Sequence, residues 1–513
     1  MEKAMHKESI PAWFESVCSK RGEEKAITFL RDGITETVLT YSGLKTEVSR
    51  FADTLRGRGI SKGDRVILFL EKSMIFAVAH LALQAIGAVS IPLNTGFKKG
   101  EMQYLLKDAD AGLVLCDTGK GDWIRQIDPG ARVMEIPTQK PYQELTRFGS
   151  HPGSSVETPL EPEDPALIIY TSGTTGNPKG AILTQKNLVQ DAANIIDIWE
   201  ITQKDVLCHA LPLFHIHGLC FALHTALLSG AHVLMLDRFE PGIVLDMLAC
   251  KDKDRTCTVF MAVPTMYTRL MDSMGEKTMD FSNIRLLTSG SAPLLIREFK
   301  RIEVLFGKKP VEREGMSETG MNFSNPLRGE RTPGSIGLPL PGLEVRIVDP
   351  NGFVDLPLGQ TGEIWLKGPC ITPGYWRKPK ETRETFEDGW FRTGDLGYVD
   401  ASGYYYLTDR IKHIIITGGE NVSAKELETV INRIDKVVES AVVGIPDPKW
   451  GEKIVAAVVA EQGSELDSNT IQTYCKEHLH SWKTPKEIRF VKMIPKNTMG
   501  KILKEEVKKI FTG

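Results

Sequence analysis

The segment TSGTTGNPKG, from Thr171 to Gly180, is the most informative stretch of this sequence. It follows the apolar run ALIIY at 166–170, which predicts a strand leading into a loop. Its glycines allow a tight turn and let a ligand approach the backbone closely. Hydroxyl groups, loop amides and one lysine together suit a polyphosphate. The predicted phosphate contacts are Thr171, Ser172, Gly173, Thr174, Thr175, Gly176 and Lys179.

Two other interpretations of this loop are weaker. A Walker A loop is excluded because the order Gly-Lys-Ser/Thr is absent. A flexible Ser/Thr/Gly linker has a similar composition, but linkers rarely join so long a hydroxyl run to a Pro-Lys-Gly ending. We therefore interpret the segment as a phosphate-binding loop.

Length and composition indicate a globular protein of several structural units. At 513 residues the chain exceeds what one hydrophobic core supports, so two to four units are expected. Hydrophobic residues make up 41% and charged residues 25%, and the formal net charge is −3. Such a balance gives no basic excess for nucleic acid or an anionic membrane surface.

The cysteines and the apolar segments favour a cytoplasmic location. The eight cysteines form no CxxC pair and show no metal-like spacing with histidine, which is typical of thiols in a reducing compartment. The N-terminus lacks the apolar core of a signal peptide. The longest apolar stretch, 74–92, is interrupted by polar residues, so a buried helix followed by a strand is expected there, rather than a membrane span.

Short apolar strands alternate with helical patterns along most of the chain, which predicts α/β layers with largely parallel sheets. Predicted strands include 65–70, 112–116, 166–170 and 231–236, and predicted helices include 44–55 and 101–108. After Gly342, short strands at 343–348, 362–367 and 403–408 suggest a small β-rich subdomain. Beyond it, helix 423–434, strands 438–445 and 453–460, and helix 468–479 predict a compact α+β unit with a basic tail. We place the domain boundary at residue 410, between 1–410 and 411–513.

The loop at 171–180 resembles the signature of the adenylate-forming superfamily, which includes acyl-CoA synthetases, luciferases and peptide-synthetase adenylation domains. Further motifs follow in the expected order over nearly the whole chain, and the most similar branch is the malonyl-CoA synthetase-like ligases. The resemblance implies a large N-terminal domain of layered αβα subdomains plus a small β-rich subdomain. It also implies a small, mobile α+β C-terminal domain that rotates between half-reactions.

Activating a carboxylate with ATP requires a held triphosphate, a divalent metal, a positioned nucleoside and stabilised charge at the α-phosphate. Glu318, with Thr171, is the predicted Mg²⁺ ligand, and Ser317 or Thr319 can donate to the α-phosphate. The resemblance implies nucleotide contacts from the two small-residue loops that contain Gly290, Ser291, Ala292, Pro293, Glu314, Gly315, Met316 and Thr319.

This chain departs from the family pattern at Glu314, where a tyrosine that stacks on adenine is usual. The glutamate removes an aromatic face and places a charge beside the base. A non-catalytic nucleotide-binding protein is the functional class that this change favours. The other retained motif residues argue against that class.

Three further positions are implied by motifs near the C-terminus. Asp395 can accept both ribose hydroxyls, and Arg410 can hold ribose or phosphate oxygens. Lys412 stands at the family's hinge. Lys501, which ends the motif PKNTMGK, is expected to be catalytic by offsetting charge at the acid carboxylate and the α-phosphate during adenylation.

The thiol and the acid are predicted from shorter matches. Gly418, Gly419, Glu420 and Trp450 resemble residues along the path of the CoA pantetheine arm. His215 and Ile216 lie in a loop that resembles the wall of the acid pocket, together with Met321. A distal carboxylate would be bound by an arginine, for which Arg238 is the first candidate and Arg285 the second.

The sequence therefore predicts an AMP-forming acid–CoA ligase with ATP, Mg²⁺ and CoA as its small-molecule partners. The acid is expected to be short, with malonate or methylmalonate as dicarboxylate candidates. A short or medium monocarboxylate, against an apolar wall of Ile216, Met321 and Phe323, is the alternative. An enzyme that loads a carrier-protein thiol also remains open, as does a luciferase-like activity. Neither a nucleic-acid partner nor an integral membrane segment is expected, and a homodimer is left open.

Overall fold

The computed structural model describes residues 8–145, 158–171, 177–252, 255–417, 420–498 and 500–512. By their internal contacts they divide into two compact units. The first comprises the chain up to Glu344 together with Lys367–Gly389, and the second comprises Val345–Leu366 with Trp390–Gly513. The boundary at residue 410 falls inside the second unit and stays a prediction about which residues move together.

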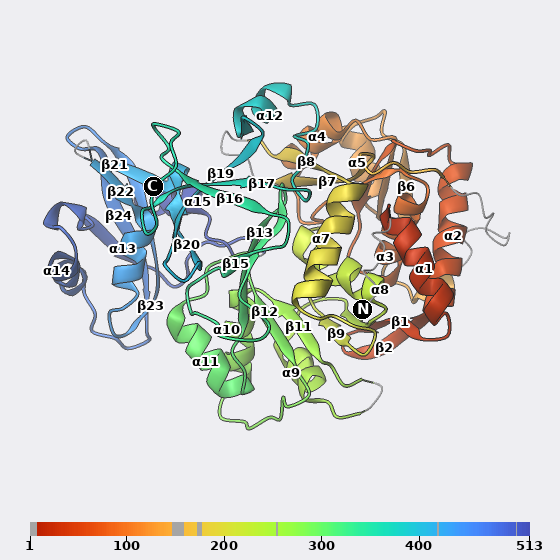
Figure 1. The fold of residues 1–513 in the computed structure, drawn as a ribbon, viewed down its shortest axis with the longest axis horizontal. Coiled ribbons are helices and arrows are strands. Elements are labelled where there is room, and N and C mark those ends of the chain that lie inside the picture. The colour runs from red at the N-terminus through yellow and green to blue at the C-terminus, as the bar shows by residue number, and fades with distance from the viewer. Residues whose placement is uncertain are drawn as a thin grey trace. The chain divides into compact units, whose positions relative to one another are not determined.

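A six-stranded sheet in the first unit holds both ends of the phosphate loop (Figure 1). Its strands pair in parallel except for β8, which runs antiparallel to β7. Thr171 pairs with Lys179 in that hairpin, so these two ends of the loop lie close together. In sheet order the strands are β6 (Val133–Ile136), β5 (Leu113–Asp117), β3 (Arg65–Phe69), β4 (Val89–Pro92), β7 (Pro165–Thr171) and β8 (Lys179–Thr184).

A nine-stranded sheet forms the other large layer of the first unit. Its inner strands, from β13 through β12, β11, β9 and β10 to β1, are parallel, and the outer strands β2, β14 and β15 are antiparallel. The bounds are β1 Lys25–Arg31, β2 Ile34–Thr40, β9 Val206–His209, β10 His232–Leu236, β11 Val259–Ala262, β12 Leu286–Ser289, β13 Val311–Met316, β14 Gly320–Ser324 and β15 Leu338–Pro339.

Helices pack around these two sheets. The segment 74–92 forms a buried helix, α3, and then β4, as expected from its apolar composition. Thr184 caps α7 by accepting a hydrogen bond from the amide of Asn187. The bounds are α1 Ile10–Arg21, α2 Tyr41–Gly57, α3 Met74–Ala85, α4 Lys99–Ala109, α5 Gly121–Ile127, α6 Tyr142–Leu145, α7 Gln185–Ile198, η1 His217–His224, α8 Thr225–Ser229, α9 Pro241–Ala249, α10 Pro264–Met274, α11 Ile296–Phe306 and α12 Pro379–Thr385, which is followed by the short strand β18, Phe386–Glu387.

The second unit contains two sheets. In the first, β16 (Glu344–Val348), β17 (Gly362–Lys367) and β19 (Trp390–Val399) lie in that order, and β20 (Tyr405–Arg410) also pairs with β19. β20 begins two residues later than the strand expected at 403–408.

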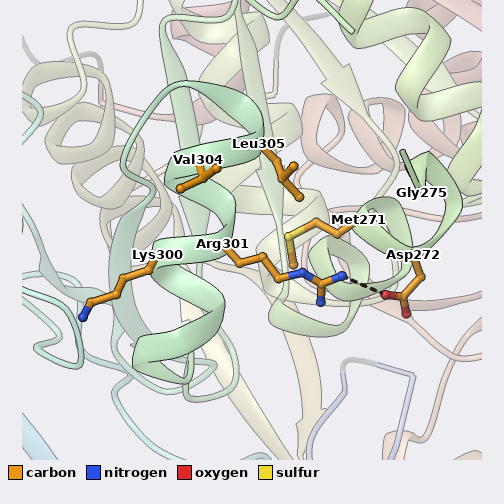
Figure 2. Close-up of a pocket in the computed structure, with 7 residues that line it drawn as sticks. All are labelled: Met271, Asp272, Gly275, Lys300, Arg301, Val304 and Leu305. Carbon is orange, nitrogen blue, oxygen red and sulfur yellow. Dashed lines mark hydrogen bonds and ion pairs between the residues drawn. The ribbon is translucent and has the colours of Figure 1, made fainter. Parts of the chain in front are cut away.

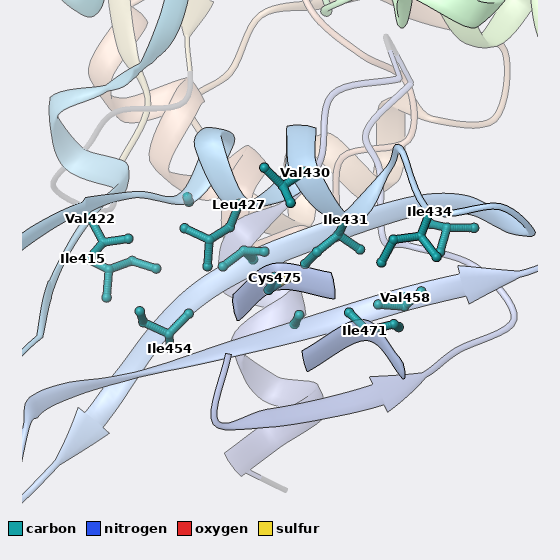
Figure 3. Close-up of a cluster of buried hydrophobic side chains, with 14 residues drawn as sticks. Ile415, Val422, Leu427, Val430, Ile431, Ile434, Ile454, Val458, Ile471 and Cys475 are labelled. Carbon is teal, nitrogen blue, oxygen red and sulfur yellow. The ribbon is translucent and has the colours of Figure 1, made fainter. Parts of the chain in front are cut away.

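The C-terminal part of the second unit is the predicted α+β fold. Aliphatic side chains of its sheet pack against α13 and α14 and form one core (Figure 3). The residues 504–512, interpreted from sequence as a basic tail, instead form helix α15, which buries Val507 and Phe511. The elements are η2 Ile411–His413, β21 Ile414–Thr417, β22 Glu420–Ser423, α13 Ala424–Ile431, β23 Val437–Asp447, β24 Gly451–Ala460, α14 Ser468–His478, η3 Ser481–Lys483, β25 Glu487–Phe490 and α15 Lys504–Thr512.

Within the described ranges, no helix has both the length and the apolar character that crossing a bilayer requires. The α/β fold class expected from the sequence is confirmed, including the large N-terminal part and the small C-terminal part.

Candidate active site

The loops that follow β9, β12 and β13 come together because these strands are parallel members of one sheet. Ligands of α/β sheets bind at this carboxyl edge. The arrangement brings together three of the predicted segments, namely the histidine loop at 211–218, the small-residue loop at 290–293 and the residues 314–319. Each of these segments was proposed separately from sequence, and the sheet places them at the same edge.

The histidine loop leads into η1, a π-helix of eight residues. π-Helical turns are rare and frequent at functional sites. Gly218 is required there, because a Cβ atom would lie 2.1 Å from the carbonyl oxygen of Pro212. His217 Nδ1 lies 3.2 Å from the Ser291 hydroxyl, so this contact joins the histidine loop to the small-residue loop. Ser291 has a positive φ of 67° in that loop.

The predicted acid-pocket wall is largely buried. Ile216, Met321 and Phe323 are all buried side chains. Burial lowers the pKa of His215 to about 4, so its ring is neutral near pH 7. Its role as an aromatic wall of the acid pocket stays a prediction. Its ring lies 4.7 Å from that of Phe214.

Glu318 and the two ends of the phosphate loop meet in the first unit. Thr171 donates a hydrogen bond to Glu318 Oε1 at 3.2 Å, and Tyr375 donates to the same oxygen at 3.1 Å. Lys179 Nζ lies 5.2 Å from the centre of the Tyr375 ring. Sequence reasoning missed Tyr375, because the run Pro373-Gly-Tyr-Trp376 lies far from the other motifs in the sequence and gave no signal. Ser172, Gly173, Thr174, Thr175 and Gly176 lie outside the described residues.

These residues fit a divalent cation. Glu318 is 7% exposed, and its Oε1 takes both hydroxyl donors, whereas no described residue donates a hydrogen bond to Oε2. A carboxylate oxygen of this kind is the ligand that Mg²⁺ prefers. Whether Thr171 also serves as a ligand stays a prediction.

The residues around Glu318 differ in their solvent exposure. Thr319 is fully buried, and its hydroxyl has no hydrogen-bond partner in the described part of the chain, while Ser317 is half-buried. Gly315 is required by a close approach, since a Cβ atom would lie 2.6 Å from the carbonyl oxygen of Gly320. Glu314 Oε2 accepts a hydrogen bond from the side-chain amide nitrogen of Asn322 at 3.0 Å. The roles of these residues toward a nucleotide stay predictions.

The two arginines proposed from sequence as anchors of the acid are bound to aspartates. The Arg238 side chain is 62% exposed and pairs with Asp32 and Asp237. Arg285 pairs with Asp205 at 2.7 Å and donates to the carbonyl oxygens of Trp199 and Glu200. Both guanidinium groups are therefore already paired, and the roles of the two arginines toward the acid stay predictions.

Arg313, on β13, differs from both of these arginines. It is 3% exposed, and none of its three side-chain nitrogens has a hydrogen-bond partner among the described residues. Its guanidinium lies 5.0 Å from the centre of the Phe221 ring on η1. Burial lowers the pKa of Arg313 to about 10, while Glu314 and Asp191 raise it. The group therefore stays charged at neutral pH.

Arg313 is close to the small-residue loop. A Cβ atom at Gly290 would lie 2.5 Å from Arg313 Nε, so the guanidinium passes directly beneath that glycine. Burial is the largest cause of the lowered pKa of His217, and the positive charge of Arg313 lowers that pKa further. Sequence reasoning did not select Arg313, although a lone arginine inside the strand 311–316, directly before the Glu318 motif, was a signal that could have been used.

In the second unit, Asp395 and Arg410 form a cross-strand pair between β19 and β20. The Arg410 guanidinium contacts both carboxylate oxygens, with Nε 2.5 Å from Oδ1 and Nη2 3.1 Å from Oδ2. Burial raises the pKa of Asp395, and the positive charges of Arg410, Lys501 and Lys412 lower it. The predicted ribose pair and the two predicted lysines therefore share one electrostatic environment.

A tight turn presents Lys501. The Lys501 amide donates to the Asn497 side chain at 3.0 Å, and the Asn497 amide donates to the Lys501 carbonyl oxygen at 2.9 Å. Helix α15 follows directly and is held by a buried pair between Lys504 and Glu428. The turn thus rests on the core of the C-terminal sheet. Lys412 lies in η2, at the end of β20.

Of the predicted CoA path, Glu420 begins β22 and Trp450 is 37% exposed. The ammonium groups of Lys449 and Lys486 lie 4.8 and 5.6 Å from the centre of a Trp450 ring. Gly418 and Gly419 lie outside the described residues. The role of this segment toward CoA stays a prediction.

A separate surface groove lies between α10 and α11 (Figure 2). Arg301 and Asp272 pair across it at 3.2 Å, and both are largely exposed. Its lining includes none of the loop residues that gather at the strand ends, so we assign it no part in the site.

Comparison with known proteins agrees with this geometry. Residues 14–376 match the AMP-binding enzyme family, and residues 426–501 match the AMP-binding enzyme C-terminal domain. A sulfoacetate–CoA ligase of Cupriavidus necator is 36% identical over 90% of this chain and 91% of the relative. A mitochondrial malonate–CoA ligase of Mus musculus is 33% identical over 88% of this chain and 83% of the relative.

The solved structure of ATP-bound MatB from Rhodopseudomonas palustris has a TM-score of 0.91 to this chain at 36% identity. The match covers 98% of this chain and 99% of MatB. Together with the family matches over both parts of the chain, this similarity shows that the protein belongs to the AMP-binding enzyme family.

Proposed function

We propose that this protein is an AMP-forming acid–CoA ligase for a short acid that carries a second anionic group. ATP and the acid give an acyl-adenylate and pyrophosphate, and the CoA thiol then displaces AMP. The relatives from Cupriavidus necator and Mus musculus are CoA ligases. The second anionic group is the part of the proposal that rests on this chain's own site.

The observation that carries the proposal is the unpartnered guanidinium of Arg313. Burying a charge without a partner costs several kcal/mol, on the order of the whole stability margin of a domain. A guanidinium offers a planar fork of donors that matches a carboxylate or sulfonate. A dianionic acid would bring the missing partner. The named substrates of the two relatives, malonate and sulfoacetate, share this feature, because each has an anionic group one methylene from its carboxylate.

The roles of the other residues follow from their positions. Lys179 and the loop at 171–180 would hold the triphosphate. Glu318 would hold Mg²⁺, which when bound neutralises phosphate charge. Asp395 and Arg410 would bind the ribose, and Lys501 would offset the charge that develops as the acid carboxylate attacks the α-phosphate. His215, neutral near pH 7, would form part of the acid-pocket wall without repelling Arg313.

The test is acid-dependent pyrophosphate release with ATP and Mg²⁺, measured with and without CoA. Malonate and sulfoacetate are compared with propionate and butyrate, which have a similar size but one charge. We expect kcat/KM to favour the dianions by about a hundredfold or more, and CoA to be needed for turnover. Pyrophosphate release with monocarboxylates alone would support a monocarboxylate–CoA ligase and contradict the arginine anchor. The acid would then contact the apolar wall of Ile216, Met321 and Phe323. Turnover with a carrier protein but not with CoA would identify that protein as the acceptor.

The variant Arg313→Met tests the anchor. Breaking one side of a buried charged contact costs about 3–5 kcal/mol, so kcat/KM for malonate should fall by about 150–5000-fold while that for propionate changes little. Arg238→Met is the matched control, because Arg238 is exposed and paired with aspartates. An equal loss for all acids in Arg313→Met would contradict the anchor, and a malonate-specific loss in Arg238→Met would assign that role to Arg238.

We place the reaction in a reducing compartment, because all eight cysteines are free. The relative from Mus musculus is mitochondrial by name, so cytoplasm and mitochondrial matrix are the two locations that cell fractionation would compare.

A further inference from the structure

Tyr375 contacts both charged groups that are predicted to bind the triphosphate and its metal ion, Lys179 and Glu318. Its hydroxyl donates to Glu318 Oε1 at 3.1 Å, and its ring lies beneath Lys179 Nζ, 5.2 Å away. Lys179 has no ion pair with any residue in the described ranges, and Glu318 has none either. The phenol side chain therefore contacts both the Lys179 ammonium group and the Glu318 carboxylate, and neither group is neutralised by an ion pair within the described residues.

The segment that carries Tyr375 is itself fixed to the phosphate-loop hairpin. Tyr375 bridges to Ala181 of β8, and the Trp376 amide donates to the Gly180 carbonyl oxygen at 2.8 Å. The Thr372 amide donates to the backbone oxygen of Glu318 at 2.7 Å. Residues 372–376 thus hold the hairpin and Glu318 in a fixed relation.

The hydrogen bonds to Glu318 decide which carboxylate oxygen faces away from the protein. Tyr375 and Thr171 both occupy Oε1. No described residue donates to Oε2. A carboxylate held by one oxygen presents the other in a fixed direction, which is what a rigid octahedral ion such as Mg²⁺ demands of its ligands.

We propose that Tyr375 is a positioning residue that prepares Glu318 for the metal through its hydroxyl and Lys179 for the triphosphate through its ring. This inference rests on the proposed function, since it requires that ATP and Mg²⁺ be bound. It adds a residue from outside the recognised motifs, and it assigns separate effects to two parts of one side chain.

The test measures ATP binding by titration calorimetry in Mg²⁺ and again in EDTA, with wild type, Tyr375→Phe and Tyr375→Leu. For Tyr375→Phe, the dissociation constant in EDTA should stay within about twofold of wild type, while the gain in affinity on adding Mg²⁺ should shrink by about tenfold, as expected for one hydrogen bond to a charged group. Tyr375→Leu should also weaken binding in EDTA, because Lys179 loses the aromatic face.

Tyr170→Phe is the matched control. Tyr170 also donates its hydroxyl to a carboxylate, that of Asp108 at 2.8 Å, and it lies one residue before Thr171. Its removal should leave the Mg²⁺-dependent gain unchanged. The positioning role would be overturned if Tyr375→Phe kept the full gain in ATP affinity on adding Mg²⁺, or if Tyr170→Phe lost as much of that gain. Either result would leave the proposed ligase function standing. A wild-type protein that does not bind ATP with Mg²⁺ would overturn both this inference and the proposed function.

Discussion

At the scale of single residues, Lys501 offers the sharpest separation of two chemical steps. The Lys501 backbone is held by a hydrogen bond to the Asn497 side chain, and the positive charge of Lys501 lowers the pKa of Asp395. A cation at this place would stabilise charge during adenylate formation, whereas the thiol step needs no such charge at the same atoms.

Lys501→Ala should therefore lose most acid-dependent pyrophosphate release and keep most thioester formation from a supplied acyl-adenylate. The half-reactions are followed separately by pyrophosphate release and by CoA-dependent consumption of the adenylate. Lys508→Ala, which removes an exposed lysine of α15, is the control and should leave both rates unchanged. Equal loss in both half-reactions would refute the assignment to Lys501.

At the scale of elements, the junction of the histidine loop with η1 is the least tolerant point of the site. Gly218 is the second residue of the π-helix and lies against the carbonyl oxygen of Pro212, and the His209 ring lies 2.8 Å from the carbonyl oxygen of Gly218 itself. Any side chain at 218 must displace the loop that bears His215.

Gly218→Ala should lower the free energy of unfolding by about 1–3 kcal/mol, the usual cost of overpacking, and should raise KM for the acid. Thermal unfolding and acid titration of the rate measure the two effects. Gly57→Ala is the control, because Gly57 ends α2 and a Cβ atom there meets no neighbour within 4 Å. It should be neutral or slightly stabilising. A Gly218→Ala protein as stable as wild type would show that the loop can move aside.

The sequence predicted elements better than it predicted partners. The strands around residues 65–70, 112–116 and 231–236 are present, because apolar runs between turn residues encode strands locally. Arg313 and Tyr375 were not selected, since their importance depends on Phe221, Gly290 and Glu318, which reach them only through the tertiary fold. For Arg238, a pair with the adjacent Asp237 was the alternative that the sequence itself offered, whereas its second partner, Asp32, is brought near only by the fold.

At the scale of the whole molecule, buried neutral histidines of the first unit make its stability depend on pH. Burial lowers the pKa of His224 and His215 to about 4 and of His209 to about 3, and it lowers the pKa of His80 and His217 well below 6.5. The unfolded chain takes up protons near pH 6.5 that the folded protein does not, so stability falls as the pH decreases from about 6.5 to 4.

Two buried acids act in the opposite direction. Burial raises the pKa of Glu312 to about 8 and of Asp191 to about 7, so the folded state binds their protons more readily than the unfolded state. Their contribution is lost as the pH rises toward 8. Burial also raises the pKa of Asp117, and it lowers the pKa of Lys72 to about 7, so that Lys72 offsets the acids above pH 7. With five histidines of lowered pKa, the first unit should lose stability steeply below pH 6 and change little between pH 7 and 8.

Denaturant unfolding from pH 5 to 8 checks this profile. His224→Gln should reduce the slope below pH 6 by up to one proton, about 1.4 kcal/mol per pH unit, because His224 pairs with His80 at 2.8 Å inside the unit. A stability that is constant between pH 5 and 7 would contradict the neutral state of these histidines.

The isolated charge of Arg313 has a consequence for how this enzyme can evolve. Replacing it with an apolar side chain of similar volume would relieve a buried, unpaired cation and so stabilise the fold. The change that would abolish the proposed preference for a dianionic acid, for instance Arg313→Met, is thus one that protein stability favours. Selection for the acid must act continuously on this position, and laboratory drift without that selection should erode specificity here before it erodes folding.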